Sequence, residues 1–238
     1  MSFDVNFAVN NFFVALSGIP ITLLITFVSV AIGLPLGFLI ALARLHRTPI
    51  LNQIFTLYLS LLRGVPTIVL IFLVYAAIPL SIKQMAAAWN WNIKVSSINP
   101  LWYAFLVFGL KSSATFSEMW RAGLHSVNLR QMEACELVGL SKYDSYTKVI
   151  IPQVLATVAP SFCSMLLSLL KDTSLVFIMT IQDITAKSKI AAGLEYKYIE
   201  GFVDALIVYV IVCVIIEWLF KHWEIHLNYY RQENLTKD

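Results

Sequence analysis

Long apolar runs, separated by short polar segments, dominate this sequence. They cover residues 12–43, 53–78, 100–124, 150–181 and 202–220. About 20 apolar residues in a helix cross the hydrocarbon core of a bilayer, where a lone segment satisfies its backbone hydrogen bonds only as a helix. Charged residues make up 13% of the 238 residues, about half their share in soluble domains. The sequence therefore predicts an all-α polytopic membrane protein with five transmembrane helices, in a single domain over residues 1–238.

A few charged residues lie inside these apolar runs. Among them are Arg63 in the second run, Lys111, Glu118 and Arg121 in the third, and Lys171 and Asp172 in the fourth. A charged side chain at the centre of a bilayer costs at least about 2.5–3.5 kcal/mol, so such residues face the protein interior. We expect four of them to share one central cavity, namely Arg63, Glu118, Lys171 and Asp172. The alternative for Arg63 is that it only neutralises a carboxylate on an adjacent helix.

The fourth run is interrupted by the sequence Lys171-Asp172-Thr173-Ser174. A helix break here would let Thr173 or Ser174 cap a short second helical piece whose N-terminus points into the protein. The free N–H groups of such a terminus attract carboxylates, and broken helices form substrate sites in transporters. The alternative is a membrane-exit turn with an exposed salt bridge between Lys171 and Asp172.

The first run contains Gly33 and Gly37, a Gly-x-x-x-Gly step that lets another helix approach closely. The run also contains Pro20 and Pro35, and it is longer than a bilayer requires. Either it is one tilted helix, which we expect, or its first turns lie along the membrane surface.

The polar stretch 131–153 lies between the third and fourth runs and is itself predicted to be helical. Residues 131–138 are rich in good helix formers and contain no helix breaker. Gly139 then stands where a helix ends with a residue in the left-handed conformation. Ser141 stands at the N-cap of a second helix, with Asp144 near its positive end. This pattern predicts a short helix, a glycine corner and a second helix that continues into the fourth run.

These features resemble the motifs of ATP-binding cassette (ABC) importer permeases, in particular those for polar amino acid uptake. The stretch 131–153 resembles their coupling motif, in which Glu-Ala-Ala is followed by a glycine and then by Ile/Leu-Pro; Cys135 stands where most relatives have the second alanine. The matching residues here are Glu133, Ala134, Gly139, Ile151 and Pro152. Three more segments resemble signatures of the same family: Arg63-Gly64-Val65-Pro66-Thr67, Ser113-Ala114 with Glu118 and Arg121, and residues 171–175. Val65 and Thr115 depart from the residues usual there, which are threonine and tyrosine.

The resemblance implies a type I permease subunit that moves a polar L-amino acid, with cystine as one candidate, across the cytoplasmic membrane by alternating access. It implies coupling residues Glu133, Ala134 and Gly139. It also implies substrate-binding residues, which are Arg63, Thr67, Ser113, Glu118, Lys171, Asp172 and Ser174. The implied partners are a second permease subunit (identical or different), two ATP-binding cassette subunits, an extracytoplasmic solute-binding protein and membrane lipid. Nucleic acid is not among them.

The sequence has no catalytic motif. It contains no Gly-x-x-x-x-Gly-Lys-Ser/Thr phosphate loop, no nucleophile–base pattern and no metal-ligand spacing. We therefore expect no enzymatic activity, cofactor or metal in this chain, and we expect the partner ATPase to bind ATP and Mg²⁺.

Five spans place the two termini on opposite sides of the membrane. Lys and Arg residues are more frequent on the side that carries the stretch 131–153, which the positive-inside rule assigns to the cytoplasm. The N-terminus is then outside and the C-terminus cytoplasmic. Two other functions stay open. One is an ion-coupled secondary amino acid transporter with Glu118 and Asp172 as proton relays, disfavoured by the lack of an internal repeat. The other is a membrane anchor for a cytoplasmic partner, disfavoured by the intramembrane charges.

Overall fold

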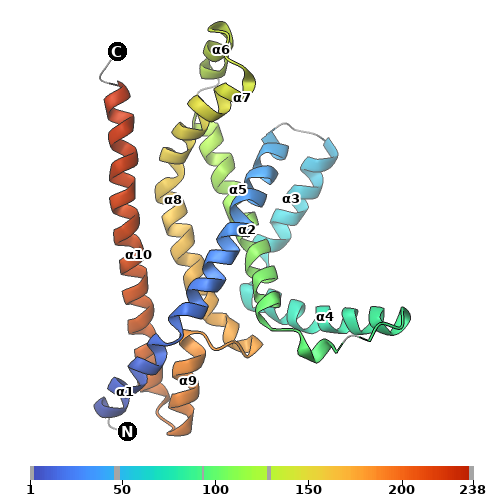
Figure 1. Cartoon of the computed structure of the whole chain (residues 1–238), viewed down its shortest axis with the longest axis vertical. Coiled ribbons are helices and arrows are strands. Elements are labelled where there is room, and N and C mark those ends of the chain that lie inside the picture. Colours follow the sequence, from blue (N-terminus) through green and yellow to red (C-terminus); the bar gives the residue numbers. More distant parts are fainter. Residues whose placement is uncertain (1–2, 46–48, 93, 128–129, 236–238) are drawn as a thin grey trace.

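The computed structural model describes residues 3–45, 49–92, 94–127 and 130–235, and this part of the chain is helical without strands (Figure 1). The predicted all-α fold is confirmed. The α-helices are α1 (Val5–Leu16), α2 (Ile19–Leu45), α3 (Pro49–Gly64), α4 (Thr67–Ala88), α5 (Leu101–Ser126), α6 (Arg130–Leu137), α7 (Lys142–Asp144), α8 (Ile151–Asp172), α9 (Ile184–Leu194) and α10 (Tyr198–Leu235). Shorter turns are the 3₁₀ helices η1 (Val95–Ser97) and η3 (Thr173–Met179) and the π-helical turn η2 (Ser145–Ile150).

Four segments of the described chain are long and apolar enough to cross a membrane. They are Val5–Leu45, Thr67–Ala88, Lys142–Met179 and Tyr198–Trp223. Helix α5 has 26 residues, which at 1.5 Å per residue also exceeds the roughly 30 Å hydrocarbon core, but it carries three charged residues. The count of five transmembrane helices therefore stays a prediction.

The first apolar run forms two helices, which corrects the expectation of one unbroken helix over 12–43. Helix α1 ends where the Ser17 N–H donates to the carbonyls of Phe13 and Val14 at 3.4 and 3.1 Å. The chain turns at Ser17 and Gly18 before α2 begins. A Cβ on Gly18 would lie 2.4 Å from the backbone nitrogen of Ile184, so only glycine permits this close approach to the start of α9.

The second run also forms two helices, and the expected single helix over 53–78 is wrong. Helix α3 ends at Gly64 and α4 begins at Thr67, with Pro66 between them. Proline has no N–H and forces the preceding residue, Val65, out of the helical region. Figure 1 shows α4 running across the direction of α3. The chain therefore changes direction at Pro66, next to Thr67, inside the apolar run 53–78.

Helices α2 and α5 pack closely against each other, and the predicted role of Gly33 and Gly37 is confirmed. A Cβ on Gly33 would lie 2.2 Å from Ser112 Oγ, and one on Gly37 would lie 2.8 Å from the backbone nitrogen of Ser117. The Ser112 hydroxyl donates to the Ser29 carbonyl at 2.7 Å across the pair. The two glycines thus bring the backbones of α2 and α5 into contact.

The fourth run begins with the π-helical turn η2, continues as α8 and tightens into η3. The predicted cap at Thr173 or Ser174 is wrong, because the chain stays helical through this point. The Thr173 hydroxyl instead donates back to the Leu170 carbonyl at 2.6 Å, as hydroxyls inside helices do. Helix η3 ends at Thr180, whose φ of 61° is left-handed.

The two ends of the molecule are formed by different helices. Figure 1 shows α6 and α7 at one end of the long axis and α1 with α9 at the other, while α10 extends along most of its length. At the α1–α9 end, the Asn11 amide is 2% exposed and donates to Ser188 Oγ at 2.8 Å and to Asp204 Oδ2 at 2.7 Å. These bonds join α1, α9 and α10.

Candidate functional site

The end that carries α6 and α7 has the geometry predicted for the stretch 131–153. Gly139 has a φ of 78°, and its N–H donates to the Glu136 carbonyl at 3.1 Å, while the Leu140 N–H donates to Cys135 at 3.0 Å. This pair of bonds is the Schellman arrangement that ends a helix at a left-handed glycine. The Ser141 side chain accepts from the Asp144 N–H at 3.1 Å, so the predicted N-cap is confirmed.

Helix α6 presents an exposed face away from the bundle. Glu133 and Ala134 are exposed, as are Leu137 at 88% and Val138 at 75%. Cys135 faces inward and is buried. This face therefore combines a carboxylate with two aliphatic side chains, all accessible to another protein. The geometry fits a docking helix.

A cavity of about 470 Å³ lies between α5 and α8. Its volume is in the range of roughly 300–1,000 Å³ typical of small-molecule sites. Its wall combines two charged residues with hydroxyl and apolar side chains: Lys111, Ser112, Thr115, Phe116, Ser161, Ser164, Met165, Ser168, Leu169 and Asp172. Ser161, Ser164 and Ser168 are spaced i, i+3 and i+7, so they follow one face of α8.

The two charges of the cavity wall form an ion pair. Lys111 Nζ lies 2.8 Å from Asp172 Oδ2 and also donates to Thr67 Oγ1. The Thr67 hydroxyl lies 3.3 Å from the same carboxylate oxygen. The three residues come from α5, α8 and the first position of α4. The corner at Pro66 is what brings Thr67 to this site.

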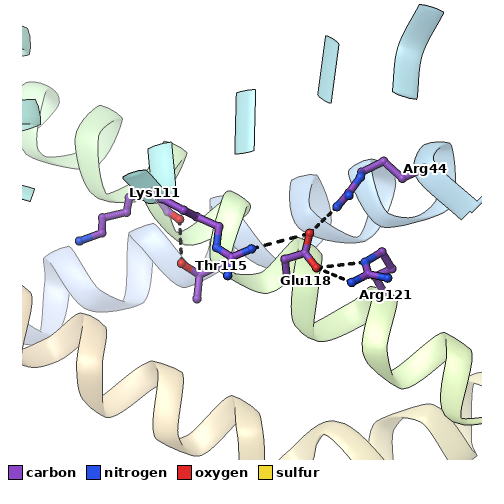
Figure 2. A network of polar contacts seen from close by, with 6 residues as sticks. Arg44, Lys111, Thr115, Glu118 and Arg121 are labelled. Carbon is purple, nitrogen blue, oxygen red and sulfur yellow. Dashed lines mark hydrogen bonds and ion pairs between the residues drawn. The ribbon is translucent and has the colours of Figure 1, made fainter. Parts of the chain in front are cut away.

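A second charged group surrounds Glu118 (Figure 2). Arg121, one turn further along α5, donates to Glu118 Oε2 through Nε and Nη2 at 3.0 and 2.8 Å. Arg44 of α2 donates to Oε1, and Arg63 of α3 lies 3.8 Å from the same oxygen. Three helices are thus joined through one carboxylate, which supports the interpretation of Arg63 as the neutralising partner of a carboxylate on an adjacent helix.

The two charged groups are separate. Figure 2 shows the Lys111 side chain directed away from Glu118. The two residues are seven positions apart on one helix, about 10 Å along its axis. Of the four residues expected in one cavity, only Asp172 lines it. That expectation is therefore wrong, because Arg63 and Glu118 form an ion pair with each other outside the cavity and Lys171 does not line it.

The other predicted binding residues have other surroundings. Ser113 is fully buried, and its hydroxyl lies 2.7 Å from that of Tyr58 on α3. Ser174 lies in η3 and does not line the cavity. Lys111 and the serines of α8 were not among the predicted binding residues. The signal for Lys111 was its charge within an apolar run, and the signal for the serines was their helical spacing.

Comparisons with known proteins agree with this architecture. Residues 33–226 match the family described as "Binding-protein-dependent transport system inner membrane component". The chain is 33% identical over 221 residues to the L-cystine transport system permease protein TcyL of Bacillus subtilis, with 92% of this chain and 90% of that protein covered. It is 32% identical over 212 residues to the probable amino-acid permease protein YxeN of the same organism, with 89% and 90% covered.

A solved structure has the same fold. A chain from the crystal structure of an amino acid ABC transporter with histidines superposes with a TM-score of 0.78 at 24% identity, over 95% of this chain and 100% of that chain. The likeness therefore extends over almost all of the fold described above.

Proposed function

The chain belongs to the family of binding-protein-dependent transport system inner membrane components and is a permease subunit of an ABC importer; on this premise we propose that it moves a polar L-amino acid across the cytoplasmic membrane by alternating access. The names of its relatives refer to amino acids and to L-cystine, which supports this substrate class. As a family member it works with a separate ATPase subunit and a solute-binding protein.

One observation carries the proposal, and it is the polar cavity between α5 and α8. A lysine, a carboxylate and several hydroxyl groups surround about 470 Å³ between two helices of a membrane protein. Intramembrane charges of this kind mark substrate pathways. We assign substrate contact to Asp172, which lines the cavity, and a supporting role to Thr67, which contacts Asp172 and Lys111 from the start of α4. Arg63, Ser113, Glu118, Lys171 and Ser174 have positioning roles in this proposal, because none of them lines the cavity.

The complex that we propose contains two permease subunits, identical or different, and two ATPase subunits that bind ATP and Mg²⁺. The exposed face of α6, with Glu133 and Ala134, contacts the ATPase. Gly139 sets the direction in which α6 leaves the chain, since its left-handed conformation creates the corner before Ser141. In this arrangement α6 and the C-terminus are cytoplasmic, and the N-terminus is outside.

The test is uptake by the complete importer reconstituted in vesicles. Asp172→Asn removes the negative charge of the cavity while keeping the shape of the side chain. We expect uptake to fall roughly 10- to 100-fold, because that factor corresponds to the loss of one hydrogen bond to a charged group. Assembly of the complex should be unchanged. Glu195→Gln is the matched control, because Glu195 lies at the C-terminal end of α9, does not line the cavity and pairs with Lys197.

The result that contradicts the proposal is unchanged uptake in Asp172→Asn. Uptake that needs an ion gradient and no ATPase subunit would instead favour the secondary transporter, in which Asp172 carries protons.

A further inference from the structure

Each of the two charged groups in the cavity wall keeps one position open for a ligand. The Lys111 ammonium has three N–H donors. Two of them bind Asp172 Oδ2 and Thr67 Oγ1. Asp172 accepts both of its described contacts on Oδ2, from Lys111 and Thr67, and its Oδ1 has no hydrogen bond to the described part of the chain. Both residues line the cavity, and their side chains are 23% and 36% exposed, so a ligand in the cavity can reach them.

A free amino acid carries the complementary pair of charges on its own backbone. Its carboxylate can accept the third N–H of Lys111, and its ammonium can donate to Asp172 Oδ1. The result is a closed ring of alternating charges, in which the existing ion pair does not have to break. Hydrogen bonds between charged partners are about twice as strong as those between neutral groups.

The cavity offers no third charge. Besides Lys111 and Asp172, its wall consists of hydroxyl side chains and of the apolar Phe116, Met165 and Leu169. The next carboxylate along α5, Glu118, is bound by arginines. A lysine, arginine or glutamate substrate would therefore bring a side-chain charge to a wall that cannot pair it, and an unpaired buried charge is costly.

We propose that the cavity selects net-neutral zwitterions, with Lys111 as the residue that binds the carboxylate and Asp172 as the residue that binds the ammonium. This inference rests on the proposed function, and it restricts the substrate to amino acids with an uncharged side chain. The serines of α8 supply hydroxyl groups for a polar side chain, and Met165 and Phe116 supply apolar contact. Lys111 is then a specificity-determining residue.

Equilibrium binding to the complex of permease and ATPase subunits, without the solute-binding protein, tests this. The probes are L-serine, L-glutamine, L-methionine and L-cystine as net-neutral ligands, with L-arginine and L-glutamate as charged ones. We expect at least one neutral amino acid to bind, and the charged pair to bind roughly 10- to 100-fold more weakly than it. L-glutamine and L-glutamate have almost the same shape, so that comparison isolates the charge.

Two derivatives of the tightest ligand then identify the roles of the two residues. The carboxamide lacks the carboxylate, and the N-acetyl form lacks the ammonium. We expect the wild type to reject both. Lys111→Gln should lose its preference for the parent amino acid over the carboxamide by at least tenfold. Asp172→Asn should lose its preference over the N-acetyl form. Lys187→Gln, which removes a half-buried lysine of α9 that donates to Ser17 and does not line the cavity, should keep both preferences.

Three outcomes overturn the inference. Equal binding of L-glutamate and L-glutamine would show that net charge is not selected, while the proposed amino acid function would stand. Unchanged preferences in Lys111→Gln would show that this lysine does not bind the carboxylate. If no amino acid binds at all, both the selectivity and the proposed substrate class are wrong.

Discussion

The contact between α2 and α5 leads to a test with an internal control. Gly37 faces the backbone of α5, and a Cβ added there would lie 2.8 Å from the nitrogen of Ser117 and 2.9 Å from the carbonyl oxygen of Ser113. Real Cβ atoms essentially never approach other atoms this closely, and backbone atoms cannot turn away as a side chain can. Gly37→Ala must therefore push the two helices apart.

The cost follows from overpacking, which is about 1–3 kcal/mol for one extra methyl group in a well-packed contact. Replacing glycine by alanine in a helix also gains up to about 1 kcal/mol of helix propensity. Gly64→Ala separates the two effects, because Gly64 is also helical but a Cβ there meets nothing within 4 Å. The difference in unfolding free energy between the two variants therefore reports the contact itself.

The assay is thermal unfolding of the purified complex in detergent. For a chain of this size, 1 kcal/mol corresponds to about 2–4 °C, so Gly37→Ala should unfold about 2–12 °C below Gly64→Ala. Tryptophan fluorescence is a suitable probe, because Trp120 of α5 donates to the Leu34 carbonyl of α2 at 3.1 Å. Equal midpoints for the two variants would refute the argument that backbone contact holds this pair.

Three further predictions concern other parts of the chain. Gly139→Val should reduce both the amount of copurified ATPase and substrate-stimulated ATP hydrolysis, because a left-handed residue with a Cβ costs about 1–2 kcal/mol. Gly139→Asn should retain more of both, because asparagine tolerates the left-handed conformation better than valine. Glu118→Gln leaves three arginines without their carboxylate and should lower the unfolding midpoint by several degrees, unlike Glu195→Gln. Burial raises the pKa of the Asp183 carboxyl above its ordinary 3.8. Just above that pH the folded state therefore binds more protons than the unfolded state, and the free energy of unfolding falls as the pH rises through this window. Asp183→Asn should lack this fall when thermal unfolding is measured across the same pH range.

The features that sequence reasoning predicted correctly depend on local backbone chemistry. A left-handed helix end selects glycine, and an N-cap selects a short hydroxyl side chain, so Gly139 and Ser141 could be placed without knowing the fold. Gly33 and Gly37 predicted a close helix contact, because glycine has no side chain to keep two helix backbones apart. Their partner helix could not be named, because spacing along one helix does not specify what packs against it.

The arrangement of the charged residues needed the structure. Lys111 and Asp172 are 61 positions apart and meet only because α5 and α8 pack together. Thr67 joins them because Pro66 turns the chain, although hydropathy alone shows a continuous run there. The sequence showed which charges need partners inside the membrane. It did not show which carboxylate pairs with Arg63, because the pairing with Glu118 depends on how the helices pack.

The π-helical turn η2 has a consequence for α6. A π turn contains one residue more than an α turn, and each residue of an α-helix rotates the chain by about 100°. Deleting one residue between Ser145 and Ile150 would restore an α turn and rotate everything before it by about that angle around the axis of α8. The face of α6 that carries Leu137 and Val138 would then point more than a quarter of a turn away. The direction of the docking surface is thus encoded by the number of residues in this segment, as well as by their identity.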